Sequence, residues 1–229
     1  MTDEHSHNEP GEAQYKRWIQ EVRSRGLTRL GLMTSWSWSD DPARLAFTFA
    51  RYKFVAKMMT GRQKVLEVGC GDGFATRIVR QSVDIVTAID FDPSFIDDAL
   101  SRQDDDWPID YRLHNILEGP LDEQFDGIYS LDVLEHIPLD SEHIYMKNVC
   151  RSLSDKGVVI IGMPSLESQI YASSQSKEGH VNCKTQDEFR ALLLDYFGFV
   201  FMFSMNDEVL HTGFGEMAHY HLGLCCGKA

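Results

Sequence analysis

The fold of this chain is decided by residues 64–81, KVLEVGCGDGFATRIVRQ. Residues 64–68 are a short apolar run rich in β-branched side chains, which is typical of a buried strand. Three glycines follow at positions 69, 71 and 73, and the remaining residues favour a helix. Glycine lets the backbone turn tightly and approach a ligand without a Cβ in the way. The stretch therefore predicts a strand, a tight turn and a helix, with a ligand site at the turn.

The same alternation of strand and helix runs through the rest of the chain. Short apolar runs predict further strands at residues 84–89, 111–113, 127–131, 157–162, 199–205 and 217–225. Helices are predicted at residues 15–25, 93–102 and 141–153. Another helix begins at Asp41-Pro42, with the proline in its first turn. A last helix runs from a Thr185-x-x-Glu188 capping box to Tyr196. This order predicts an α/β fold with a doubly wound, mostly parallel seven-stranded sheet, helices on both faces and an antiparallel pair at the end.

Length and charge exclude several classes of protein. The 229 residues suffice for one sizeable core, and they carry 22 Lys and Arg against 35 Asp and Glu, a net charge of −13. Nucleic acids and anionic membranes bind through clustered basic residues, so both are disfavoured as partners. No stretch approaches ~18 apolar residues, and the polar start lacks the pattern of a secretion signal. We therefore expect no membrane insertion and a cytoplasmic location.

Two acidic residues indicate what the glycine turn binds. Glu67 stands just before the glycines, where it would repel a pyrophosphate but suits a cationic ligand. Asp90 ends the second predicted strand, 19 residues after Gly71, where it can accept hydrogen bonds from both hydroxyls of a ribose. The third glycine comes two residues after the second rather than three, so the turn departs from the dinucleotide-binding pattern G-x-G-x-x-G.

Four motifs in order resemble those of the class I S-adenosylmethionine-dependent methyltransferases. They are LEVGCGDG, AIDFDPSFIDDA, FDGIYSLDVLEHIP and VVIIGMPS, and the resemblance runs from Lys64 to about Pro164. It implies a Rossmann-like methyltransferase fold with S-adenosylmethionine as cofactor. The alternative is that these glycines and acids are only the turns and helix caps of an ordinary doubly wound fold.

The resemblance implies a role for each matching residue around the cofactor. Gly69 and Gly71 would bring the backbone beside the methionine part, and Asp90 would hold the ribose. Phe91 would pack on the adenine, and Leu131 would lie under the cofactor.

Two further cofactor contacts are expected at polar residues. Asn115 stands where the family usually has an aspartate that accepts from the adenine amino group, and its amide oxygen can still accept. Arg51 lies on the helix ahead of the glycine turn, from which the family often reaches the cofactor carboxylate or the substrate.

A second group of functional residues follows the fourth predicted strand. Asp132, Glu135 and His136 stand at i, i+3 and i+4 and would share one face of a helical turn. This D-x-x-E-H arrangement resembles the E-x-x-E-H metal motif of small-RNA 2′-O-methyltransferases, which implies a further ligand at His180 and an ion such as Mg²⁺ or Mn²⁺. LEHI also resembles ubiquinone-pathway O-methyltransferases, so a metal-free helix-end pair stays open. A third interpretation makes His180 or His136 a metal-free general base.

The N-terminal part is interpreted as a cover for the acceptor. Residues 1–42 are predicted to form a flexible N-terminus and a helical lid segment, and residues 43–229 the S-adenosylmethionine-binding catalytic domain. Trp36 and Trp38 can cover an apolar surface or stack on a sugar ring. His211 lies in a glycine-bearing loop that can close over the acceptor.

The leading hypothesis is an O-methyltransferase that acts on a hydroxyl of a sugar or glycan precursor. Arg44 and Arg51 stand seven residues apart on one helix face and could hold one phosphate or carboxylate, but not an RNA duplex. We therefore expect a small sugar-bearing or anionic acceptor and no nucleic acid. Metal-free methylation of an amine, quinone or phenol is the alternative, followed by a non-catalytic cofactor-binding protein. The sequence predicts no oligomeric state.

Overall fold

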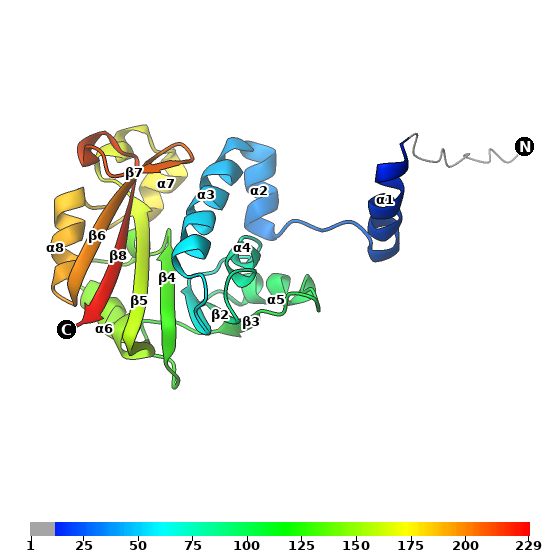
Figure 1. Ribbon diagram of the computed structural model, residues 1–229. Coiled ribbons are helices and arrows are strands. Elements are labelled where there is room, and N and C mark those ends of the chain that lie inside the picture. The colour runs from blue at the N-terminus through cyan, green and yellow to red at the C-terminus, as the bar shows by residue number, and fades with distance from the viewer. Residues whose placement is uncertain (1–11) are drawn as a thin grey trace, which may run out of the picture. The chain divides into compact units, whose positions relative to one another are not determined.

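The computed structural model of the protein describes residues 12–229 (Figure 1). The chain divides into two compact units, one that ends at Leu30 and one from Gly31 to Ala229. In the first, helix α1 spans Ala13–Arg25. The predicted segment 1–42 thus includes the first unit and the start of the second, and residues 1–11, part of the predicted N-terminus, lie outside the described residues. Among the described residues, no helix has the length and apolar character needed to cross a membrane.

The second unit is built on one eight-stranded sheet with the order β3-β2-β1-β4-β5-β8-β6-β7. Its strands are β1 Lys64–Val68, β2 Ile85–Asp90, β3 Asp110–Leu113, β4 Phe125–Leu131, β5 Leu153–Pro164, β6 Phe197–Asn206, β7 Val209–His211 and β8 Tyr220–Lys228. Strands β1 to β5 pair in parallel, and β8 runs antiparallel between β5 and β6. The predicted mostly parallel sheet is confirmed. Its eighth strand is β7, a three-residue hairpin partner of β6 that is too short to predict.

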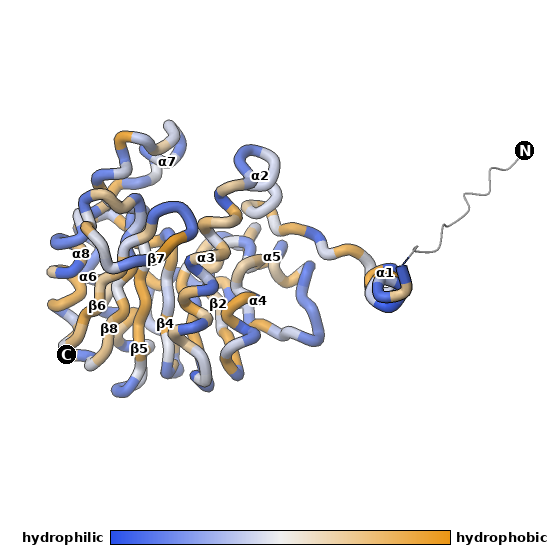
Figure 2. The backbone as a smooth tube through the Cα atoms, turned by 45° about the horizontal axis from the view of Figure 1, so that its top comes forward, coloured by the Kyte–Doolittle hydropathy of each residue, from blue (hydrophilic) through white to orange (hydrophobic). Residues whose placement is uncertain are grey.

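Helices cover both faces of this sheet (Figure 1). One face carries α3 Ala43–Met58, α4 Thr76–Arg80 and α5 Pro93–Ser101, and the other α6 Glu142–Ser152 and α8 Gln186–Leu194. Successive residues of β1 alternate between the two cores, with Val65 on the α3 side and Leu66 on the α6 side. Because the central strands are buried on both faces, they carry continuous apolar runs, such as residues 158–161 of β5, a strand that is largely orange in Figure 2.

Helix α2, at Leu32–Asp40, lies in the segment predicted to form a helical lid, but the sequence does not predict its bounds. Its sequence, LMTSWSWSD, is poor in strong helix formers, and distant carboxylates cap its first turn instead. Asp72 accepts from the Thr34 N–H at 2.8 Å and from the Thr34 hydroxyl at 3.2 Å, and Asp98 accepts from the Leu32 N–H at 3.2 Å. Since these partners lie 38 and 66 residues away, no local pattern could indicate where the helix begins.

Short elements occupy several connections between the later strands. They are η1 Leu134–His136, η2 Glu167–Tyr171, α7 Ser174–Gly179 and η3 Gly215–Met217. The last of these replaces the start of the predicted strand at residues 217–225, so β8 begins at Tyr220. The predicted capping box is present, with Thr185 and Glu188 bonded reciprocally at the start of α8. Segments after β4 and β5 thus lie at the carboxyl ends of parallel strands, where α/β sheets place ligands.

Candidate active site

The glycine turn after β1 is fixed to the end of β2 by backbone hydrogen bonds. The N–H groups of Gly69 and Cys70 both donate to the Ile89 carbonyl, at 2.8 and 3.0 Å. Gly69 and the next two glycines of the turn have φ angles of 78°, 52° and 65°, in the left-handed region that favours glycine. A Cβ on Gly69 would lie 2.2 Å from Val133 Cγ2. Glycine is therefore required by the conformation and by the close approach of the chain after β4.

Asp90 ends β2 and shapes the same turn. Its carboxylate is 7% exposed and accepts from the N–H of Gly71 at 2.9 Å and of Asp92 at 3.0 Å. A carboxylate has about four lone-pair sites, so Asp90 can still accept hydrogen bonds from a hydroxyl-bearing ligand. Phe91 follows directly and is 73% exposed, which leaves its ring available for an aromatic ligand.

Two other predicted cofactor residues lie at the carboxyl ends of β4 and β3. Leu131 ends β4, and its side chain is buried in the core on the α3 side. Asn115 lies just beyond β3, where its Oδ1 accepts from the Leu117 N–H at 3.0 Å. An amide oxygen has two lone pairs, so one acceptor position on Asn115 remains for a ligand.

Glu67 lies beneath the glycine turn rather than on its surface. It is 1% exposed, and its two carboxylate oxygens accept from the hydroxyls of Tyr52 at 2.6 Å and of Thr76 at 2.5 Å. Burial raises the pKa of Glu67 from 4.5 to about 7, although both hydroxyl bonds act in the opposite direction. Both carboxylate oxygens of Glu67 thus accept hydrogen bonds from the protein itself. Glu67 would therefore affect a ligand only indirectly, by supporting the glycine turn.

The raised pKa of Glu67 predicts a pH dependence of stability. Between 4.5 and about 7 the folded state binds a proton that the unfolded state has lost, so the free energy of unfolding falls as pH rises through this window. Glu67→Gln removes the titrating group and keeps its shape. We expect the unfolding free energy of the wild type, relative to Glu67→Gln, to fall by about 2–3 kcal/mol across the window.

Urea denaturation of both proteins at several pH values measures this difference. The comparison cancels other titrations, such as that of His221, whose burial lowers its pKa to about 4. A difference that does not change with pH would contradict the placement of Glu67.

Arg51 and Asp132 form an ion pair between α3 and the end of β4. One guanidinium nitrogen of Arg51 donates to both Asp132 oxygens, at 2.8 and 2.9 Å, and the guanidinium carbon lies 3.7 Å from the centre of the Tyr220 ring. Asp132 has a φ of 56°, outside the helical region. The residues from Asp132 to His136 therefore do not form the helical turn that their spacing predicts, and the Asp132 carboxylate contacts Arg51 instead.

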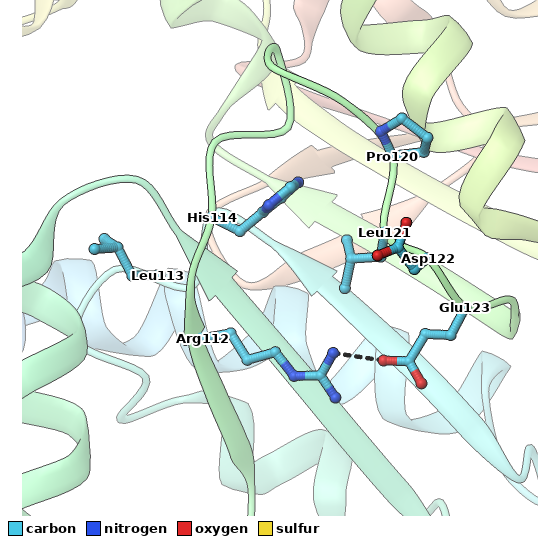
Figure 3. A pocket seen from close by; sticks show the side chains of 7 residues that line it. All are labelled: Arg112, Leu113, His114, Pro120, Leu121, Asp122 and Glu123. Atoms are coloured by element: carbon cyan, nitrogen blue, oxygen red, sulfur yellow. Dashed lines mark hydrogen bonds and ion pairs between the residues drawn. The ribbon is translucent and has the colours of Figure 1, made fainter.

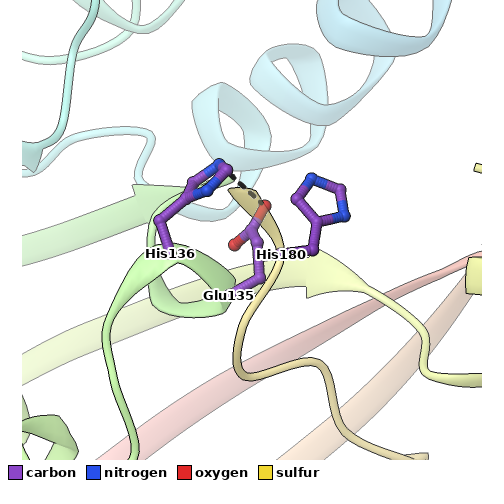
Figure 4. A group of neighbouring side chains, drawn as sticks. All are labelled: Glu135, His136 and His180. Carbon is purple, nitrogen blue, oxygen red and sulfur yellow. Dashed lines mark ion pairs between the residues drawn. The ribbon is translucent and has the colours of Figure 1, made fainter. Parts of the chain in front are cut away.

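Glu135, His136 and His180 come together beyond the end of β4 (Figure 4). Each offers one ligand atom, and these atoms lie within 4.8 Å of one another. Glu135 is 1% exposed, and neither of its carboxylate oxygens has a hydrogen-bond donor among the described residues. Burial, and then the charge of Asp132, raises the pKa of Glu135 well above its ordinary value. Burial, and then His136, lowers the pKa of His180, which favours a neutral imidazole with a free lone pair.

A buried network brings His180 to this position from a distant part of the chain. The N–H groups of residues 181 and 182 both donate to the Glu135 carbonyl, at 2.8 and 3.0 Å. The Asn182 side chain donates to Glu142 at 2.8 Å, and the same carboxylate pairs with Lys184 at 2.8 Å. The chain that follows α7 is thereby fixed against the η1 turn. The predicted pairing of Glu135 and His136 with His180 is thus present in the structure, without Asp132.

The predicted substrate residues differ in their surroundings. Trp36 and Trp38 on α2 are 60% and 58% exposed, so both rings can contact a ligand. The Arg44 side chain, near the start of α3, lies 3.0 Å from a carboxylate oxygen of Asp40 at the end of α2. Arg44 and Arg51, predicted to hold an anion together, are therefore each paired with a carboxylate already.

His211 belongs to the β6–β7 hairpin. Its Nε2 lies 2.7 Å from Asn206 Oδ1, and its Nδ1 accepts from the Gly213 N–H at 3.0 Å. Both ring nitrogens are thus engaged within the hairpin, which fixes the ring in place.

Two polar residues that shape the site carry no signal in the sequence. Asp72 caps α2 across 38 residues, and Gln169 accepts from the His180 ring across 11. A Cβ on Gly71 would lie 2.8 Å from Met33 Sδ, so the first turn of α2 lies against the glycine turn. Only the folded chain reveals these contacts, because each joins segments without a shared pattern.

A separate surface pocket lies beside the edge strand β3 (Figure 3). Its lining residues are Arg112, Leu113, His114, Pro120, Leu121, Asp122 and Glu123. Arg112 donates to Glu123 at 2.5 Å, and Lys64 pairs with the same carboxylate. The pocket shares no residue with the Glu135 group, and its charged side chains at Arg112 and Glu123 satisfy one another.

Comparison with known proteins agrees with this geometry. The family described as methyltransferase domain matches residues 66–161. The ubiquinone biosynthesis O-methyltransferase of Rickettsia bellii is 34% identical over 110 residues, which are 47% of this chain and 45% of the relative. The chain therefore spans about half the length of this curated relative.

Solved structures of methyltransferases share the fold at low sequence identity. The N-methyltransferase NodS of Bradyrhizobium japonicum, in complex with S-adenosyl-L-homocysteine, has a TM-score of 0.64 at 18% identity, covering 85% of this chain and 92% of its own. The methyltransferase domain of bacterial CtHen1 has a TM-score of 0.65 at 16% identity, covering 80% and 100%. Residues 66–161 thus match the methyltransferase domain family, and the fold is one that solved methyltransferases share.

Proposed function

We propose that the protein is an S-adenosylmethionine-dependent O-methyltransferase that acts on a small-molecule hydroxyl with the help of a divalent cation. The proposal for the cofactor is supported by the glycine turn, by Asp90 with acceptor capacity left for a ribose, and by the exposed ring of Phe91. S-adenosylmethionine, when bound, supplies a methyl group on a positively charged sulfonium. The chain's part is to hold the acceptor oxygen in line with that group and to remove its proton.

One observation carries the proposal for the cation. Glu135 is buried, neither carboxylate oxygen accepts a hydrogen bond from the described residues, and its Oε1 lies 3.9 Å from His136 Nε2 and near His180. A buried carboxylate without a partner is unfavourable, and a cation bound to it removes that penalty. One carboxylate and two imidazoles suit a divalent transition ion such as Mn²⁺, and Mg²⁺ is also compatible. An ion held by Glu135, His136 and His180 would lower the pKa of an acceptor hydroxyl, so that its proton could be removed near neutral pH.

The Arg51–Asp132 pair supports the same assignment. Asp132 is the acid closest in sequence to Glu135, and Arg51 already neutralises it. Three ligands thus remain at Glu135, His136 and His180, which leaves coordination positions for an acceptor hydroxyl. In the metal-free alternative, His136 or His180 would take the proton directly as a general base.

For the acceptor, we propose a neutral hydroxyl compound, with a sugar or glycan precursor as the first candidate. The exposed Trp36 and Trp38 support this class, since aromatic faces stack on sugar rings. An anionic acceptor has less support, because Arg44 and Arg51 are paired with Asp40 and Asp132. The net charge of −13 argues against a nucleic-acid substrate.

Chelation of metal ions separates the metal-assisted mechanism from its alternative. We expect methyl transfer by the purified protein to fall at least ~100-fold in EDTA and to return with added Mn²⁺ or Mg²⁺, because proton removal depends on the cation. Transfer of labelled methyl groups to a panel of acceptors provides the measurement. Undiminished activity in EDTA would exclude the cation and leave a histidine base.

A phenol or quinone ring is the second candidate acceptor. It is favoured by the relative from Rickettsia bellii, whose name places it in ubiquinone biosynthesis. A panel of phenols, amines, sugars and sugar nucleotides distinguishes the two classes. Turnover of any member would exclude a non-catalytic cofactor-binding protein.

A further inference from the structure

Both histidines of the Glu135 group are hydrogen-bonded through Nδ1. The Nδ1 of His136 lies 2.9 Å from the Gly179 carbonyl oxygen, and that of His180 lies 2.8 Å from Gln169 Oε1. Both partners are amide oxygens, which only accept, so each Nδ1 must carry the hydrogen and donate it. A neutral imidazole carries one hydrogen on its two nitrogens, so each Nε2 keeps its lone pair.

A second hydrogen bond fixes the orientation of the Gln169 amide. Its Nε2 donates to the Ser165 carbonyl oxygen at 3.0 Å. If the amide were turned over, its oxygen would face that carbonyl oxygen, and its NH₂ group would face the ring of His180. Ser165 therefore requires the amide nitrogen on its own side and leaves the amide oxygen for His180.

The anchor of Gln169 is itself held rigidly. Ser165 is fully buried, its N–H donates to the His219 carbonyl at 3.0 Å, and its hydroxyl donates to the Ala218 carbonyl at 2.7 Å. This series of hydrogen bonds joins the His180 ring to the end of β5 and to the chain that enters β8. His180 itself lies in a connection, directly after the six-residue helix α7. Its ring orientation thus depends on Gln169 more than on its own backbone.

We infer that Gln169 is a positioning residue that holds His180 in the tautomer with the hydrogen on Nδ1, so that Nε2 presents a lone pair to a divalent cation at Glu135. The inference rests on the metal-assisted function proposed above. Histidine in water prefers the opposite tautomer, with the hydrogen on Nε2, which cannot bind a metal through that atom. Loss of an outer partner of this kind typically lowers metal affinity about 10–100-fold.

Two variants of Gln169 and one control test the inference. Gln169→Met has a similar length and no acceptor, whereas Gln169→Glu keeps an oxygen acceptor for the Nδ1 hydrogen. Gln81→Met makes the same change at an exposed glutamine that directly follows α4. Nitrogen NMR of the full chain, labelled at its histidine rings in metal-free buffer, reports the tautomer of His180 directly. The His180 signals are those missing from a His180→Phe variant, and calorimetry with MnCl₂ gives the affinity.

We expect His180 to carry its hydrogen on Nδ1 in the wild type, in Gln81→Met and in Gln169→Glu, and to shift toward the Nε2–H tautomer in Gln169→Met. The Mn²⁺ affinity should fall about 10–100-fold in Gln169→Met and recover in Gln169→Glu. A His180 tautomer that is unchanged in Gln169→Met would overturn the inference, even if the wild type binds Mn²⁺. A wild type that binds no Mn²⁺ would instead overturn the proposed metal-assisted function, and the tautomer would still show whether Gln169 orients the ring.

Discussion

Replacing Glu135 with glutamine is expected to lower kcat/KM for methyl transfer by about 10²–10⁴-fold, the range for losing the group that enables proton removal. Glutamine has nearly the shape of glutamate but cannot supply a negatively charged oxygen to a cation. Mn²⁺ binding should therefore be lost together with activity. Because Glu135 is buried and its raised pKa favours the neutral acid, Glu135→Gln should unfold at the same temperature as the wild type or above it.

The control for this experiment is an acid far from the site. Asp155→Asn removes one negative charge at the start of β5, where the side chain is 95% exposed. Asp155→Asn should match the wild type in activity and in Mn²⁺ affinity. If Glu135→Gln also kept both, the buried carboxylate would have no role in the reaction.

Replacing Asp90 with alanine should weaken cofactor binding by about 1.5–3 kcal/mol, or about 10- to 150-fold in Kd, the range for hydrogen bonds to a charged group. Two effects contribute to this loss. The ribose hydroxyls lose their acceptor, and the N–H groups of Gly71 and Asp92 lose the carboxylate that fixes the turn. Calorimetry with S-adenosylhomocysteine, the product form of the cofactor, measures the effect without turnover.

Asp84→Asn is the matched control for Asp90, since Asp84 is exposed just before the opposite end of β2. It should bind S-adenosylhomocysteine as tightly as the wild type. Equal affinity in Asp90→Ala, in a variant shown to be folded, would mean that the ribose lies elsewhere.

Much of the fold could be predicted from the sequence because its signals are local. The apolar run at Lys64–Val68, the glycines after it and the Thr185–Glu188 capping box each act within a few residues, and all three form as predicted. The bounds of helix α2 could not be predicted, because its sequence is a weak helix former and its cap comes from Asp72 and Asp98. The short strand β7 depends on pairing with β6 in the same way.

The candidate site shows the same division between local and distant effects. The chain brings Glu135 and His136 together with His180, as the resemblance implies. The same resemblance, and the spacing of a helical turn, also placed Asp132 in this group, which the structure does not do. The left-handed backbone at Asp132 breaks that turn, and the contact with Arg51, 81 residues away, takes its carboxylate. A spacing rule is therefore reliable only where the backbone has the conformation that the rule assumes.

Calorimetric titration of the wild-type chain with S-adenosylmethionine tests the central claim most directly. The arrangement of the glycine turn, Asp90 and Phe91 predicts saturable binding of one molecule per chain, weakened in Asp90→Ala and unchanged in Asp84→Asn. The absence of saturable binding by the folded wild-type protein would contradict the assignment as an S-adenosylmethionine-dependent methyltransferase.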